Sequence, residues 1–97
     1  MARENQQKKR SRFETMNIIL RLCTNGLKKT HVMYRANLSH QQLEKYLEIL
    51  MVRDLLAIKD GNYVTTPRGI TFMQKYNELT GFMNKENSRP QVYQTNQ

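Results

Sequence analysis

The sequence predicts one small domain that is mainly α-helical and carries a single β-hairpin. Its 97 residues leave room for one hydrophobic core. Apolar residues recur with helical spacing in several segments, and two short alternating segments flank an Asp-Gly turn. Apolar side chains make up 38% of the chain, but no apolar run approaches the roughly 18 residues that a membrane-spanning helix needs.

A first helix is expected over residues 13–25. Four apolar residues share one side of it at the spacing i, i+3, i+4 and i+7: Met16, Ile19, Leu20 and Cys23. Asn25-Gly26 then provides a left-handed stop. Leu27 lies between this stop and the next helix, where a very short strand fits.

The next segment has the pattern of two helices joined by a tight turn. Thr30 is expected to cap a second helix that runs to about Ala36, and Asn37 tolerates the positive φ that the turn needs. Ser39 and Gln42 then form a capping box that opens a third helix over residues 40–53. Two helices joined in this way are a helix-turn-helix.

A hairpin and a last helix complete the order. Residues 56–59 and 62–65 alternate with period two around Asp60-Gly61, which predicts two paired strands. Thr66 as N-cap and Pro67 as first helical residue start a fourth helix from residue 67. The order helix, short strand, helix, helix, hairpin, helix is that of a winged helix-turn-helix, in which the hairpin is the wing.

The charge balance favours a polyanionic partner. Sixteen Lys and Arg residues against eight Asp and Glu give a formal net charge of +8. Nucleic acid is the first candidate, ahead of an acidic protein surface or an anionic lipid. The single cysteine excludes an intrachain disulfide and fits a reducing compartment, and the first residues lack the apolar core of a signal peptide. We therefore expect a cytoplasmic, nucleoid-associated protein.

The composition divides the chain into three parts. Residues 1–12 are expected to be a flexible basic arm, 13–83 the winged domain, and 84–97 a disordered polar tail. The cations of the arm immediately precede a helix, as in arms that enter a minor groove: Lys8, Lys9, Arg10 and Arg12. The alternative is that they form only a solvated tail.

Several motifs occur in the order seen in one known family. The run from Lys29 to Ser39, then residues 43–47, 60–63 and 66–69, resembles the small archaeal winged helix-turn-helix proteins. This resemblance, which extends over residues 16–79, implies a basic DNA-binding protein of chromatin or of gene regulation. It also implies a homodimer held by an antiparallel coiled coil of the last helix.

The chain departs from that family's pattern in two places. Thr65 stands where the family usually has a larger aliphatic residue. In addition, the last helix is expected to be short and interrupted by Gly81. The second departure bears on the length of any coiled coil.

The third helix carries the candidate base-reading surface. If Leu43 points inward, the side chains of Gln41, Gln42 and Lys45 point outward. Glutamine can pair with adenine N6 and N7, although both glutamines fit an ordinary solvated helix start as well. The remaining candidate DNA contacts lie at helix starts, near the end of the second helix, in the wing and just beyond it: Lys29, Thr30, Arg35, Ser39, His40, Lys59, Asn62 and Arg68.

The fourth helix carries an apolar stripe with coiled-coil spacing. Its members follow one another at intervals of four, three and four residues: Phe72, Tyr76, Leu79 and Met83. We expect this stripe to form a symmetric dimer seam. The competing interpretation is that it covers Ile18 and Leu22 of the first helix within one chain.

The residues that support chemistry are few. His31 and His40 have no partner at metal-binding spacing, and no base–nucleophile pair or phosphate-cradling glycine loop can be assembled. We therefore expect no enzyme, no metal or cofactor, and no small-molecule effector. The expected function is double-stranded DNA binding, as a transcriptional regulator or a chromatin protein.

A second function class stays open. Glu44 and Glu48, the wing with no net charge, and outward-facing Ile49 and Val52 are compatible with a winged helix that binds protein. Such a chain would be a subunit of a transcription or replication assembly.

Overall fold

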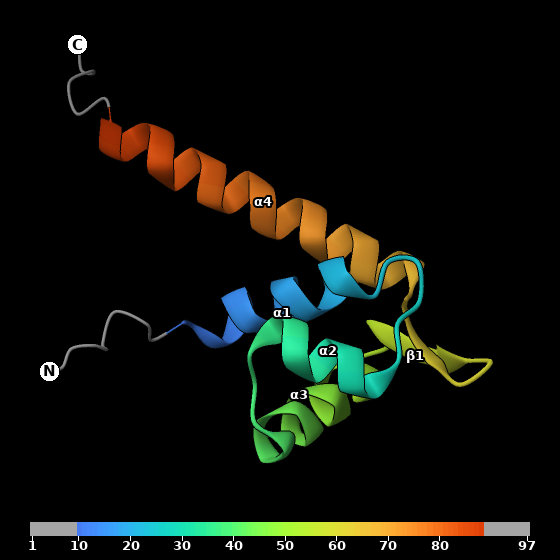
Figure 1. Cartoon of the computed structure of the whole chain (residues 1–97). Coiled ribbons are helices and arrows are strands. Elements are labelled where there is room, and N and C mark those ends of the chain that lie inside the picture. The colour runs from blue at the N-terminus through green and yellow to red at the C-terminus, as the bar shows by residue number, and fades with distance from the viewer. Residues whose placement is uncertain (1–9, 89–97) are drawn as a thin grey trace, which may run out of the picture.

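The computed structural model describes residues 10–88, with side chains as far as Met83 (Figure 1). The elements follow in the order α1 (Arg12–Leu22), α2 (Lys29–Ala36), α3 (His40–Val52), β1 (Leu56–Lys59), β2 (Asn62–Thr65) and α4 (Pro67–Ser88). Leu27 pairs with Tyr63 in an isolated antiparallel bridge. This order confirms the predicted winged arrangement, while residues 1–9 and 89–97, with most of the expected arm and tail, lie outside the described residues.

The helix α1 lies between α4 and the pair α2–α3 (Figure 1). The buried apolar residues come from α1 with its C-cap, from α2 and α3, from the connection after α3 and from the first strand of the wing: Met16, Ile19, Leu20, Cys23, Val32, Ala36, Leu43, Leu47, Leu50, Leu55 and Leu56. Burial raises the pKa of the Cys23 thiol to about 11, as expected for a small core residue. None of the helices in the described region is both long and apolar enough to cross a membrane.

The start of α2 differs from the prediction. Lys28, not Thr30, is the N-cap, and it makes no side-chain capping bond among the described residues. The Leu27–Tyr63 bridge accounts for this, because it fixes extended backbone immediately before Lys28 and lets the helix begin at Lys29. Similarly, α1 ends at Leu22 with Cys23 as C-cap, three residues short of the expected end.

The turn into α3 is as predicted. Asn37 is left-handed, with φ 58°. The side chain of Ser39 accepts a hydrogen bond from the Gln42 amide N–H at 3.1 Å, and Gln42 Oε1 accepts one from the Ser39 N–H at 2.9 Å. This capping box satisfies two backbone donors and fixes where α3 begins.

The wing also forms where the turn residues predict. β1 and β2 are antiparallel, with Lys59 opposite Asn62, and Asp60 and Gly61 both have positive φ, as a type I′ turn requires. At the base of the wing, the buried hydroxyl of Thr65 donates to the Leu20 carbonyl at 2.6 Å. A larger aliphatic residue at this position would lack that bond.

The last helix is longer than predicted. α4 runs without interruption through Gly81 to Ser88, so residues 84–88 are helical and not part of a loose tail. One glycine costs about 1 kcal/mol, which is too little to end a helix already propagating from a packed first half. That first half packs on the core through Phe72 and Met73.

Candidate nucleic-acid interface

The helix α3 exposes the surface that the sequence predicts for it. Leu43, Leu47 and Leu50 face the core. The residues on the opposite side are exposed: Gln41, Lys45, Glu48 and Val52. The first two turns of this side are polar and the end is apolar, with Val52 75% exposed. Ile49, which was expected to face outward, packs partly against the core.

One flank of α3 forms a surface hollow with the start of α1. We call it the α1-side hollow and define it by its lining residues: Arg12, Gln41, Gln42, Lys45 and Tyr46. Arg12, the first residue of α1, was predicted to belong to the basic arm, and the fold places it beside the first two turns of α3. Tyr46 was not among the predicted contacts, although its place on the helical wheel beside Gln42 indicated this flank.

The other flank of α3 faces α2 and is occupied by an ion-pair cluster. The Glu44 carboxylate pairs with the Lys29 ammonium, and its Oε2 lies 3.5 Å from Nε2 of His40. The hydrogen bond between Lys29 and Glu44 lowers the pKa of Glu44 and raises that of Lys29. Lys29 and His40, both predicted to contact DNA, therefore already have an acidic neighbour.

Gln41 and Gln42 are not equivalent. The capping box uses Gln42 Oε1, which is the acceptor that bidentate adenine recognition would need. The Gln41 amide makes no hydrogen bond within the described part of the chain, and its side chain is exposed. Of the two, Gln41 is better suited to read a base.

Two predicted DNA contacts take part in bonds that hold the fold. Nη2 of Arg10 donates to the Ala36 carbonyl at 2.7 Å, which ties the chain before α1 to the end of α2. Nε of Arg68 donates to the Arg53 carbonyl at 3.0 Å and so joins the start of α4 to the end of α3. Sequence spacing does not reveal these bonds, because each joins segments that only the fold brings together.

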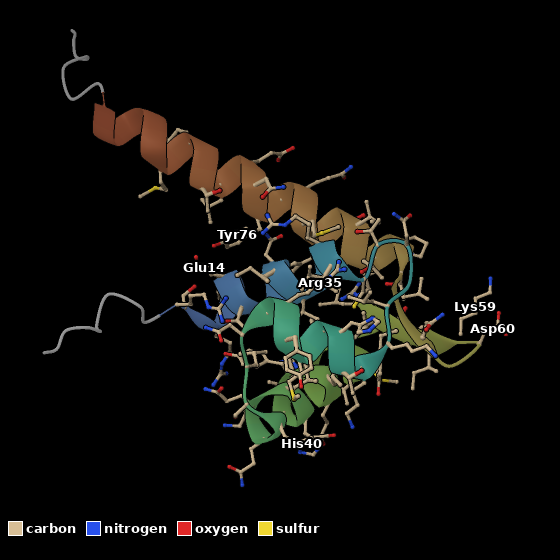
Figure 2. The ribbon with its side chains drawn as sticks, in the orientation of Figure 1. Glu14, Arg35, His40, Lys59, Asp60 and Tyr76 are labelled. Carbon is tan, nitrogen blue, oxygen red and sulfur yellow. The ribbon has the colours of Figure 1, made fainter. Side chains whose placement is uncertain are left out.

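The remaining predicted contacts are dispersed. Figure 2 places Lys59 and Asp60 at the tip of the wing, well away from His40 at the start of α3. Arg35 lies on the side of α2 nearer α1, again away from His40. Thr30 is exposed and Asn62 is half-buried. Lys8 and Lys9 lie outside the described residues.

The apolar stripe of α4 divides into two parts. The ring centroids of Phe72 and Phe13 are 6.3 Å apart, so the first part packs on α1 of the same chain. Tyr76 stacks on Phe72 and lies on the side of α4 that faces α1 (Figure 2). The second part is exposed, with Leu79 59%, Phe82 61% and Met83 47% accessible.

The comparisons with known proteins agree with this architecture. Residues 9–84 match a family model described as winged helix-turn-helix. The structure is similar to that of Sso10a-2, a DNA-binding protein from Sulfolobus solfataricus, with a TM-score of 0.69 and 24% identity over 90% of this chain and 100% of that one.

A sequence relative is known from another archaeon. An uncharacterised protein of Methanocaldococcus jannaschii is 36% identical over 53 residues, which is 55% of this chain and 25% of that protein. The chain thus spans only part of the relative's length. Because the family model covers most of the sequence, the chain belongs to the winged helix-turn-helix family.

Proposed function

We propose that this protein binds double-stranded DNA as a homodimer and places the first two turns of α3 in the major groove. The observation that carries the proposal is the exposed, polar surface of those turns, with Gln41 able to address a base edge and Lys45 a phosphate. The net charge of +8 adds attraction that does not depend on sequence.

The comparisons support the choice of DNA. Helix-turn-helix proteins dock their second helix in the major groove, and α3 is that helix here. The structurally similar Sso10a-2 is itself described as a DNA-binding protein. On the outer side of the first two turns of α3, the exposed residues Gln41 and Lys45 are both polar.

Dimerisation is proposed to use the outer half of α4. Leu79, Phe82 and Met83 are exposed there, although large apolar side chains are usually covered. Since Phe72 is already packed on its own α1 and Tyr76 stacks on Phe72, a seam between two chains would begin near Leu79, beyond the packed half of the helix. The helix continues to Ser88, which lets the seam extend past Met83, the last residue of the predicted stripe.

Titration of a generic duplex at several salt concentrations tests the proposed DNA binding. The logarithm of the association constant should fall linearly with the logarithm of salt concentration, with a slope of about −0.9 for each phosphate neutralised. No binding at low salt, or binding that ignores salt, would contradict the proposal.

Selection from random duplexes separates the two biological roles. A sharp preferred motif indicates a regulator, and a flat profile indicates chromatin packaging. If a motif is found, Gln41→Ala should weaken the preference at one position and leave generic binding intact. Gln74→Ala, on exposed Gln74 of α4, is the matched control and should change neither.

One observation favours a second function, protein binding. Met51, Val52 and Ile58 are exposed apolar side chains at the end of α3 and in β1. If the isolated chain fails to shift any duplex at low salt and instead forms a stoichiometric complex with a purified transcription or replication subunit, this function replaces DNA binding.

A further inference from the structure

We infer that the α1-side hollow is a binding site for a backbone phosphate of duplex DNA, and that it fixes the duplex on the α1 flank of α3. The inference rests on the proposed DNA binding and adds to it the side of α3 along which the phosphate backbone runs. It also adds Tyr46 as a contact residue.

The lining of the hollow has the chemistry of an anion site. Arg12 contributes a guanidinium, Lys45 an ammonium and Tyr46 a phenolic hydroxyl, and the two glutamine amides add neutral donors. No carboxylate lines the hollow among the described residues. The nearest acid in the sequence of α1, Glu14, lies on the side of α1 away from α3 (Figure 2).

The opposite flank of α3 does not offer a comparable site. On that flank Lys29 is paired with Glu44, and the same carboxylate lies close to His40. A phosphate placed there would have to displace or repel Glu44, whereas a phosphate in the α1-side hollow meets two cations and no described acid. This asymmetry across α3 selects the α1 flank.

The hollow is also held in shape by the fold. Ser11 caps α1, because its hydroxyl accepts the Glu14 N–H at 3.0 Å. Immediately before it, Arg10 is bonded to the Ala36 carbonyl at the end of α2. These two bonds fix where α1 begins relative to the helix-turn-helix and so position Arg12 beside Lys45. Arg10 is therefore a positioning residue in this account.

The inference is tested by single substitutions that each remove one positive charge, either from the α1-side hollow or from α4. Arg12→Gln and Lys45→Gln should each make the negative slope of log K against log salt shallower by about 0.9. Each should also weaken binding equally on all duplex sequences. Lys75→Gln removes the same charge from exposed Lys75 on α4 and should leave the slope unchanged. Tyr46→Phe should weaken binding without changing the slope, because the hydroxyl is uncharged.

The opposite flank supplies a charge-neutral comparison. The double substitution Lys29→Ala with Glu44→Gln removes the ion pair without altering the net charge and should leave the salt slope unchanged. Far-ultraviolet circular dichroism checks that each variant is folded. The less disruptive Arg12→Lys, which keeps the charge in the α1-side hollow, should keep the wild-type slope of log K against log salt.

Three results would overturn the inference while leaving the proposed function intact. In the first, Arg12→Gln has the same salt slope as the wild type. In the second, Arg12→Gln and Lys75→Gln lose the same amount of DNA affinity. In the third, the salt slope becomes shallower only in the Lys29 and Glu44 double variant. A wild-type chain that binds no duplex at low salt would overturn the proposed function itself, and the inference with it.

Discussion

At the scale of single residues, the two glycines Gly69 and Gly81 of α4 differ in how much space surrounds them. A Cβ added at Gly69 would lie 2.3 Å from the Leu55 carbonyl oxygen and 2.6 Å from a methyl carbon of Thr65. At Gly81, apart from its chain neighbours and the backbone of its own helix, no atom of the described residues lies within 4 Å of such a Cβ. Gly69 is therefore required by the close approach of α4 to the base of the wing, and Gly81 has no such constraint.

Gly69→Ala should lower the free energy of unfolding by about 2–3 kcal/mol, because the contacted atom is backbone and must shift. Gly81→Ala should not lower it, and should raise the helical signal of outer α4 since alanine favours the helix by about 1 kcal/mol. Urea unfolding followed by circular dichroism measures both. Equal stability of the Gly69 variant and wild type would show that α4 does not pack as described.

Because the Cys23 thiol is buried, we expect it to react slowly with alkylating reagents and to make the free energy of unfolding depend on pH. Because burial raises its pKa to about 11 from 9.0, the folded protein keeps the thiol protonated and unreactive at neutral pH. The unfolded thiol loses its proton near its ordinary pKa, so this group should reduce the free energy of unfolding as pH rises above 9.0. Labelling with iodoacetamide at pH 8 should follow global unfolding, and rapid labelling of the native state would place Cys23 outside the core.

At the scale of elements, the outer half of α4 is predicted to hold two chains together. Leu79→Glu places a charge on the exposed apolar face, which should convert the proposed dimer into a folded monomer because Leu79 lies outside the core of its own domain. Asn77→Glu adds the same charge at an exposed polar position of the same helix and serves as the control.

Sedimentation equilibrium over a range of concentrations measures this directly. The wild-type chain and the Asn77 variant should have the mass of a dimer, and the Leu79 variant that of a monomer. A wild-type monomer at all concentrations would leave the exposed face of α4 without the proposed partner.

The elements that the sequence predicts well are those fixed by neighbouring residues. The Asp60-Gly61 turn sets the strands of the wing, and the Ser39–Gln42 capping box sets the start of α3, because both operate over a few residues. The predicted start of α2 was wrong, because the actual start depends on Leu27 pairing with Tyr63, which is distant in sequence.

In the candidate site, too, the features set by neighbouring residues could be predicted, and those that depend on distant segments could not. The outward face of α3 could be predicted from the positions of its leucines. The pairing of Lys29 with Glu44 and the bond from Arg10 to Ala36 could not, because each depends on how separate segments pack in three dimensions. These contacts decide which of the predicted cations already have partners in the fold.

At the scale of the whole molecule, the proposed DNA-binding and dimer surfaces are separated. Figure 1 shows α4 on one side of α1 and the pair α2–α3 on the other, with outer α4 extending beyond the domain. Association of two chains through outer α4 would therefore leave α3 of each chain accessible. The dimer would present two DNA-binding helices, which doubles the number of phosphates that one particle can contact.

Chemical-shift mapping of backbone amides during titration with a short duplex tests the position of the DNA most directly. We predict that the largest shifts occur at the start of α1 and over the first two turns of α3, around Arg12, Gln41 and Lys45, with little change in outer α4. Shifts concentrated at Met51, Val52 and Ile58, with those turns unaffected, would contradict the account.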